Sequence, residues 1–99
     1  MNKYECLYII DNELDDESKN AIVTKFSTLV GDNGGKVTAL DIWGTRKFAY
    51  KINFKAQYRT EGYYVLMGFE SDGSFVAELE RQMRNNEDIV RELVTAIEE

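Results

Sequence analysis

The sequence predicts an α+β sandwich in which two helices cover one face of a four-stranded antiparallel sheet. Segments with strand and helix periodicity follow one another in the order strand, helix, strand, strand, helix, strand. The 99 residues are enough for one hydrophobic core, and 43% of them are hydrophobic and 30% charged, as in ordinary globular proteins. We therefore expect a single domain over residues 1–99.

The first strand and the first helix are indicated by a change of period. Residues 3–10 alternate and are rich in Tyr, Leu and Ile, which is typical of a strand. The acidic stretch 11–17 follows, and in it Asp15 is a candidate helix N-cap. Apolar residues then recur at helical spacing: Ile22, Val23, Phe26, Leu29 and Val30. "GDNGG" at 31–35 ends this helix, and because it does not open one, it does not predict a phosphate-binding loop.

Residues 36–54 return to a strand pattern, and their length of 19 residues far exceeds that of a typical strand. Gly44 near the middle predicts a bulge or bend that lets the strand curl. Alternation assigns one face of the second half to the core: Phe48, Tyr50 and Ile52. The opposite face then carries Lys47, Ala49 and Lys51.

The remaining elements follow the same reasoning. Residues 55–61 are a predicted polar turn, and residues 62–70 and 89–97 are predicted strands. The second helix begins at Asp72 or Ser74, and its apolar stripe is Phe75, Val76, Leu79 and Met83, with Glu80 and Arg84 paired on the outer side. The complete order predicts the split βαβ, ferredoxin-like sandwich, which leaves one sheet face uncovered. The fold by itself assigns no function.

Composition excludes several kinds of chemistry. The chain has one cysteine, Cys6, and no histidine, so it lacks a Cys–His pair and the usual zinc ligands. We expect Cys6 to be a buried structural thiol. We expect no enzyme activity, no cofactor and no metal site. No segment has the length of a membrane span and the N-terminus lacks a signal-peptide cleavage site, so we expect a cytoplasmic protein without a membrane partner.

Charge is distributed unevenly along the chain. The net charge is −6, yet the segment 46–59 has a charge of +5 and contains no Asp or Glu. Aromatic residues are interleaved with its cations, and this combination favours binding to phosphates and bases of RNA. The alternative is a solvated edge strand whose lysines prevent strand-to-strand aggregation.

The stretch "WGTRKFAYKI" resembles the bacterial small-subunit ribosomal protein six family. Members of that family carry Trp-Gly, then basic residues, then an apolar residue and Ala-Tyr; here these are Trp43, Gly44, Arg46, Lys47, Phe48, Ala49 and Tyr50. The opening "MNKYECLYII" and the strand "GYYVLMGFE" are also similar to the family, so the resemblance covers nearly the whole chain. Two features depart from it. Lys51 stands where many members have Pro. Many members end with basic residues or a longer tail, whereas this sequence ends on Glu98 and Glu99. We expect these two glutamates to be solvated.

The resemblance implies the same ferredoxin-like fold and a structural role in the small subunit of the cytoplasmic ribosome. It implies binding to small-subunit ribosomal RNA as a heterodimer with small-subunit ribosomal protein eighteen, and no small-molecule substrate. An acidic chain attracts RNA weakly, so a basic partner would supply the missing charge. The expected RNA-binding residues are Lys3, Arg46, Lys47, Lys51, Lys55 and Arg59.

Two alternatives share the fold. A ligand-binding regulatory module would have a Gly-rich turn between the first strand and the first helix, and an acylphosphatase-type enzyme would have an anion-binding loop with an Arg there. The acidic stretch 11–17 has neither feature.

Overall fold

The computed structural model describes residues 2–97, so the predicted exposure of Glu98 and Glu99 concerns positions outside the described residues. The chain forms β1 (Asn2–Asp11), α1 (Asp16–Asp32), β2 (Lys36–Phe54), β3 (Gln57–Ser71), α2 (Gly73–Asn85) and β4 (Ile89–Ala96). The strands pair in the order β2-β3-β1-β4, and every neighbouring pair is antiparallel. The predicted ferredoxin-like α+β fold is therefore confirmed.

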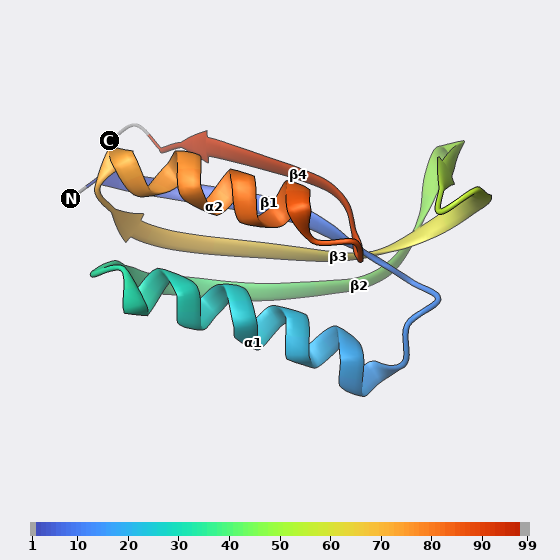
Figure 1. Cartoon of the computed structure of the whole chain (residues 1–99), viewed down its shortest axis with the longest axis horizontal. Coiled ribbons are helices and arrows are strands. Elements are labelled where there is room, and N and C mark those ends of the chain that lie inside the picture. The colour runs from blue at the N-terminus through green and yellow to red at the C-terminus, as the bar shows by residue number, and fades with distance from the viewer. Residues whose placement is uncertain (1, 98–99) are drawn as a thin grey trace.

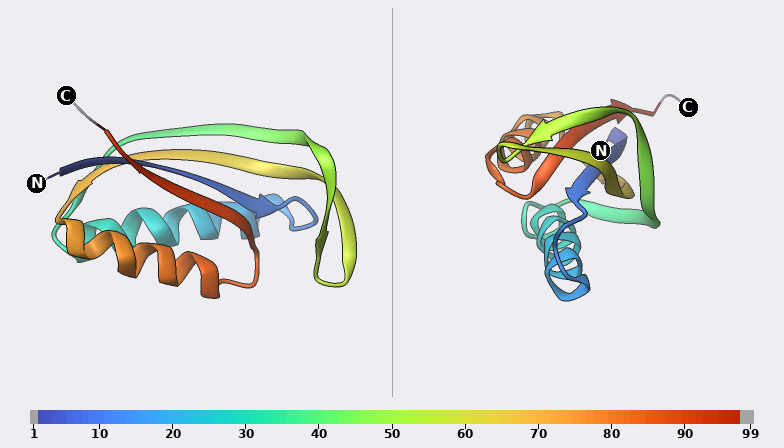
Figure 2. Two further views of the ribbon diagram at one scale, coloured as in Figure 1. Left: turned by 90° about the horizontal axis from the view of Figure 1, so that it is seen from above. Right: turned by 90° about the vertical axis from the view of Figure 1, so that its right-hand side faces the viewer.

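Both helices lie on the same face of the sheet, and the opposite face has no covering element (Figure 2). The hydrophobic core fills the space between the two layers. β1 and β3 each direct alternate side chains into it, so both central strands are buried on their helix side. The fully buried core residues are Cys6, Tyr8, Ile10, Phe26, Val30, Val65, Met67, Phe69, Leu79 and Met83. Cys6 is thus confirmed as buried, and its burial, with smaller contributions from Glu92 and Glu80, raises its pKa to about 12.

The acidic stretch before α1 ends in a helix cap. The backbone N–H of Ser18 donates to Oδ1 of Asp15 at 2.8 Å, which confirms Asp15 as the N-cap. α2 begins after Asp72, whose side chain makes no capping hydrogen bond. On the outer surface of α2, Arg84 lies 3.5 Å from Glu80, as their spacing predicts.

β2 contains three register shifts, and they overturn the strict alternation expected for its second half. The shifts lie at Val37/Ala39, Ile42/Gly44 and Lys47/Ile52, and Gly44 at the second has a φ of +79°, which confirms the predicted bulge. The prediction that Tyr50 lies in the core is wrong, because its side chain is 84% exposed. A single extra residue reverses which face each later side chain occupies.

Phe48 and Ile52 also differ from the expectation, since both are only half-buried. Phe48 packs against Tyr64, on the sheet face that the helices do not cover, with ring centroids 6.3 Å apart. Lys47 lies opposite Glu61, on the side of β3 that Tyr63 shares. The predicted faces are therefore exchanged at these positions.

The predicted polar turn at 55–61 is too long. Only Lys55 and Ala56 form the turn, and β3 already begins at Gln57. The ends of β2 and β3 consequently form a long hairpin that projects beyond the rest of the sheet, at the end where α1 begins (Figure 1). Within the described residues, neither helix has the length and apolar character needed to cross a membrane.

Candidate nucleic-acid interface

The β2–β3 hairpin closes through a two-residue turn with an unusual backbone. Lys55 and Ala56 have φ values of 54° and 60°, both in the left-handed region. Two-residue hairpin turns favour this geometry because it matches the twist of the strands, but glycine or asparagine normally provides it. For other residues the left-handed conformation is unfavourable by about 1–2 kcal/mol each. Contacts between the hairpin and the rest of the molecule therefore have to offset the unfavourable energy of these two backbone conformations.

Two aspartates beside the hairpin provide such contacts. Arg59 donates from Nε to Oδ1 of Asp11 at 2.9 Å and from a terminal nitrogen to Oδ2 at 3.5 Å. Lys55 Nζ lies 2.6 Å from Oδ1 of Asp88 and 3.6 Å from Oδ2 of Asp11. We call these four residues the hairpin clasp. The clasp joins the hairpin to the end of β1 and to the residue before β4.

Burial and neighbouring charges shift the pKa of Asp11 in opposite directions. Burial by itself raises the pKa of Asp11, but hydrogen bonds from Arg59 and from the N–H of Glu13, together with the charges of Arg59 and Lys55, outweigh it, so its pKa is lowered. The hydrogen bond to Asp88 raises the pKa of Lys55. Asp11, Lys55 and Arg59 therefore stay ionised at neutral pH. Lys55 and Arg59, both predicted to bind RNA, are thus paired with carboxylates of the same chain.

Arg46 belongs to an aromatic stack on the uncovered sheet face. Its guanidinium carbon lies 5.0 Å from the ring centroid of Trp43, and the Trp43 ring is nearly parallel to that of Tyr64, with centroids 6.3 Å apart. The indole N–H donates to Asp41 at 3.1 Å, which holds the ring in place. Arg46 remains exposed at the outer end of this stack.

Lys47 and Lys51 are also exposed, and neither forms an ion pair within residues 2–97, whereas the exposed Lys55 is paired with Asp88. Lys51 follows the exposed ring of Tyr50, whereas Lys47 lies opposite Glu61 in the strand register. The structure therefore brings five of the six predicted residues together on one hairpin.

Lys3 lies apart from this group. It is near the start of β1, opposite Glu70, whereas the clasp contacts the other end of that strand at Asp11. The two positions are eight residue steps apart along an extended strand, which corresponds to about 26 Å. Figure 1 shows the start of β1 and the hairpin at opposite ends of the molecule.

The uncovered sheet face has an apolar centre. Leu7 of β1 lies opposite Leu66 of β3 and Leu93 of β4, and these side chains and Trp43 line a shallow hollow of about 290 Å³. Leu93 is 62% exposed and Trp43 38% exposed. Exposed apolar side chains gathered in one patch are typical of a protein-binding surface.

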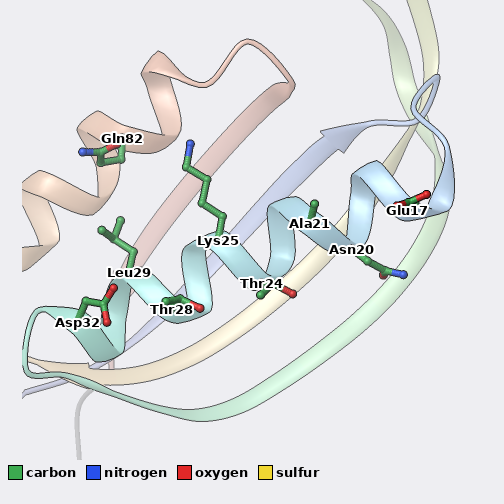
Figure 3. A pocket seen from close by; sticks show the side chains of 9 residues that line it. All are labelled: Glu17, Asn20, Ala21, Thr24, Lys25, Thr28, Leu29, Asp32 and Gln82. Atoms are coloured by element: carbon green, nitrogen blue, oxygen red, sulfur yellow. The ribbon is translucent and has the colours of Figure 1, made fainter.

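A second groove lies on the helix side of the molecule. It has a volume of about 650 Å³ and is formed by residues 17–32 of α1 together with Gln82 of α2 (Figure 3). Its charged residues are Glu17, Lys25 and Asp32, which Figure 3 shows spread along the helix rather than converging on one point. It therefore does not supply the convergent polar groups of a small-molecule site. The described residues also contain no cluster of Cys, Asp and Glu able to hold a metal ion.

The clasp acids were not foreseen from the sequence. Asp11 stood in a stretch assigned to helix capping, and Asp88 in a segment assigned to the end of a helix. The one available signal is that Asp11 ends β1 and Asp88 precedes β4, which lie at the same end of the sheet once the strand order is known. Arg91 lies outside the basic segment in the sequence, and the fold places it beside the hairpin.

Comparison with known proteins agrees with this architecture. The profile of the family described as ribosomal protein S6 matches residues 3–96. The small ribosomal subunit protein bS6 of Clostridium acetobutylicum is 42% identical over 98 residues, covering 99% of each chain. That of Desulforamulus reducens is 45% identical over 94 residues, covering 95% of each. The crystal structure of 30S ribosomal protein S6 from Thermotoga maritima superimposes with a TM-score of 0.88 at 29% identity, over 97% of this chain and 87% of that one. The chain therefore belongs to the ribosomal protein S6 family and is a protein of the small ribosomal subunit.

Proposed function

We propose that the chain binds small-subunit ribosomal RNA through the exposed cations of the β2–β3 hairpin, while its uncovered sheet face binds small-subunit ribosomal protein eighteen. The observation that carries this proposal is the concentration of basic residues on a projecting hairpin of an otherwise acidic member of a ribosomal family. Its role is structural, and it acts in the ribosome without a small-molecule substrate or cofactor.

The clasp divides the predicted RNA-binding residues by role. Arg46, Lys47 and Lys51 are exposed and are the candidates for direct phosphate contacts. Lys55 and Arg59 are paired with carboxylates, which favours a positioning role in which they hold the hairpin in its curled form. Lys3 would make a separate contact at the other end of the sheet.

The partner is supported by charge and by the apolar sheet face. A chain with a net charge of −6 has a weak overall attraction for RNA, so a basic partner in the same complex would raise the affinity for the RNA. The hollow beside Trp43 and Leu93 offers that partner an apolar contact area. Large anchors such as Trp contribute much of the affinity of typical protein interfaces.

The test is a titration of a platform fragment of the small-subunit RNA, at two salt concentrations, with protein eighteen present and absent. The double variant Arg46→Ala and Lys47→Ala removes two phosphate contacts, so the slope of log affinity against log salt should decrease by about 1.5. The matched control is Arg81→Ala with Arg84→Ala, which removes the same charge from the outer surface of α2. An unchanged slope in the hairpin variant, or an equal change in the control, would contradict the proposal.

A further inference from the structure

A groove lies between the curled hairpin and the sheet. Hairpin residues 48–53 form one wall, and Ile9, Tyr64 and Arg91 form the other. The groove has a volume of about 470 Å³, which lies in the range of pockets that hold a small molecule. It is thus large enough for one nucleotide and too small for a duplex.

The groove depends on Gly62. A Cβ added at this position would lie on Cγ2 of Ile9 and 2.6 Å from Cζ of Phe48. Because glycine has no Cβ, the Phe48 ring can rest on the strand and bring the hairpin close to the sheet. The clasp ties the hairpin tip to Asp11 and Asp88.

The groove attracts anions. Lys51 and Arg91 are its two charged lining residues, and none of its described lining residues is an Asp or Glu. Arg91 is exposed and forms no ion pair with any residue of the described range 2–97. Its neighbour Glu92 is on the other face of β4, where it lies 3.4 Å from Arg84. The charge of Arg91 is therefore available to a ligand.

Aromatic rings lie beside these cations. Tyr50 is 84% exposed, so its ring gains no stabilisation from packing within the chain. Tyr64 is held by the neighbouring rings of Trp43 and Phe48. Exposed aromatic rings, or rings held in place by neighbouring rings, commonly stack on unpaired bases when basic side chains lie beside them.

We propose that this groove holds one unpaired nucleotide of the bound RNA, with its phosphate between Lys51 and Arg91 and its base against the ring of Tyr50. The inference rests on the proposed function and adds Arg91 and Tyr50 to the RNA-binding residues. Aromatic rings together with cations favour a nucleotide over an acidic peptide, which would use the cations alone.

The experiment measures binding of the same platform RNA fragment to the complex of the full chain with protein eighteen. The test variants are Arg91→Gln and Tyr50→Leu. The control variants are Arg84→Gln, an exposed arginine on the helix side, and Tyr58→Leu, a 71% exposed ring on the same hairpin but outside the groove. Each test variant should bind at least tenfold more weakly, and each control within twofold of the unchanged chain. Thermal unfolding confirms that all four variants fold.

A second measurement locates the ligand. NMR signals of the methyl groups of Ile9 and Ile52 should shift when RNA is added to the complex of the unchanged chain, and should shift much less in the Arg91→Gln variant. If the unchanged chain binds RNA but the test variants bind equally well, the groove proposal is overturned and the proposed function stands. If the unchanged complex does not bind RNA, both fail. If Arg91→Gln weakens binding to protein eighteen without RNA, the groove holds a segment of that protein, and the nucleotide proposal is overturned.

Discussion

Nε of Arg59 lies 2.9 Å from Oδ1 of Asp11, although 48 residues separate them in the chain. Asp11 is 2% exposed and Arg59 is 8% exposed, so the pair is shielded from solvent by the hairpin that it helps to hold. The pair connects the last residue of β1 to the start of β3. The shape of the proposed RNA-binding surface therefore depends on an acid, in a chain whose RNA affinity is expected to come from its cations.

The Asp11→Asn variant should lose about 3 kcal/mol of folding stability at pH 7, because it leaves the buried charge of Arg59 without its counter-ion. Urea unfolding measures this loss. Glu78→Gln is the control, since it breaks an ion pair with Arg81 on the exposed surface of α2, where such pairs contribute little. An equal loss in both variants would show that the clasp is no stronger than a surface pair.

The stability of the unchanged chain should depend on pH through the same residue. The pKa of Asp11 is lowered below its ordinary value of 3.8 in the folded state. Its contribution is therefore fully present above about pH 5 and is lost as the pH falls through the folded pKa. Between about pH 5 and pH 2 the free energy of unfolding should fall more steeply in the unchanged chain than in Asp11→Asn. Parallel curves would contradict the role assigned to Asp11.

The Gly62→Ala variant should be destabilised by about 1–3 kcal/mol, because its new methyl group overlaps with Ile9 and Phe48. The control is Gly31→Ala in the last turn of α1, where no atom other than those of its two chain neighbours and the adjacent helix backbone lies within 4 Å of the added Cβ. That variant should be more stable by up to about 1 kcal/mol, because alanine favours helix over glycine. Chemical unfolding of both variants separates the two effects, and a stabilised Gly62→Ala would contradict the close packing of Phe48.

The Ala56→Gly variant should be more stable by up to about 1 kcal/mol, since glycine adopts the positive φ of this position without strain. The control is Ala77→Gly in the interior of α2, which should be destabilised by about 1 kcal/mol. Opposite shifts in the unfolding midpoint would support the two-residue turn. A loss of stability at both positions would indicate that the turn has another geometry.

The Tyr8→Phe variant should be as stable as the unchanged chain or more stable by about 1 kcal/mol. The hydroxyl of Tyr8 is buried and has no hydrogen-bond partner among the described residues, whereas its ring packs on the edge of Phe26 with centroids 5.9 Å apart. Tyr8→Ala should lose about 3–5 kcal/mol because it removes the ring as well. A large loss in Tyr8→Phe would reveal a buried partner for the hydroxyl, such as an ordered water.

Local sequence patterns were sufficient for the order of the elements and for most of their ends. The apolar stripe of α1, the cap at Asp15 and the bulge at Gly44 each follow from a few neighbouring residues. The concentration of cations in 46–59 is likewise a property of the sequence alone. Such features are predictable because their physical cause acts over one or two turns of the chain.

The second half of β2 could not be predicted in the same way. Three register shifts break the two-residue period, so counting from one end assigned Tyr50 to the core and Lys47 to the wrong face. A bulge is set by how two strands curl around each other, which depends on residues far away in the sequence. Gly62 shows this, since its lack of a side chain matters only because Phe48 folds onto it.

The sequence by itself thus determined the fold class, the family and the basic segment. Only the tertiary structure decided which cations of that segment are paired with carboxylates. Asp11 pairs with Arg59 at a separation of 48 residues, and Asp88 pairs with Lys55 at a separation of 33 residues. Arg91 of the last strand lies beside the hairpin. The physical reason is that charges interact through space over a few ångströms, whereas the sequence orders them only along the chain.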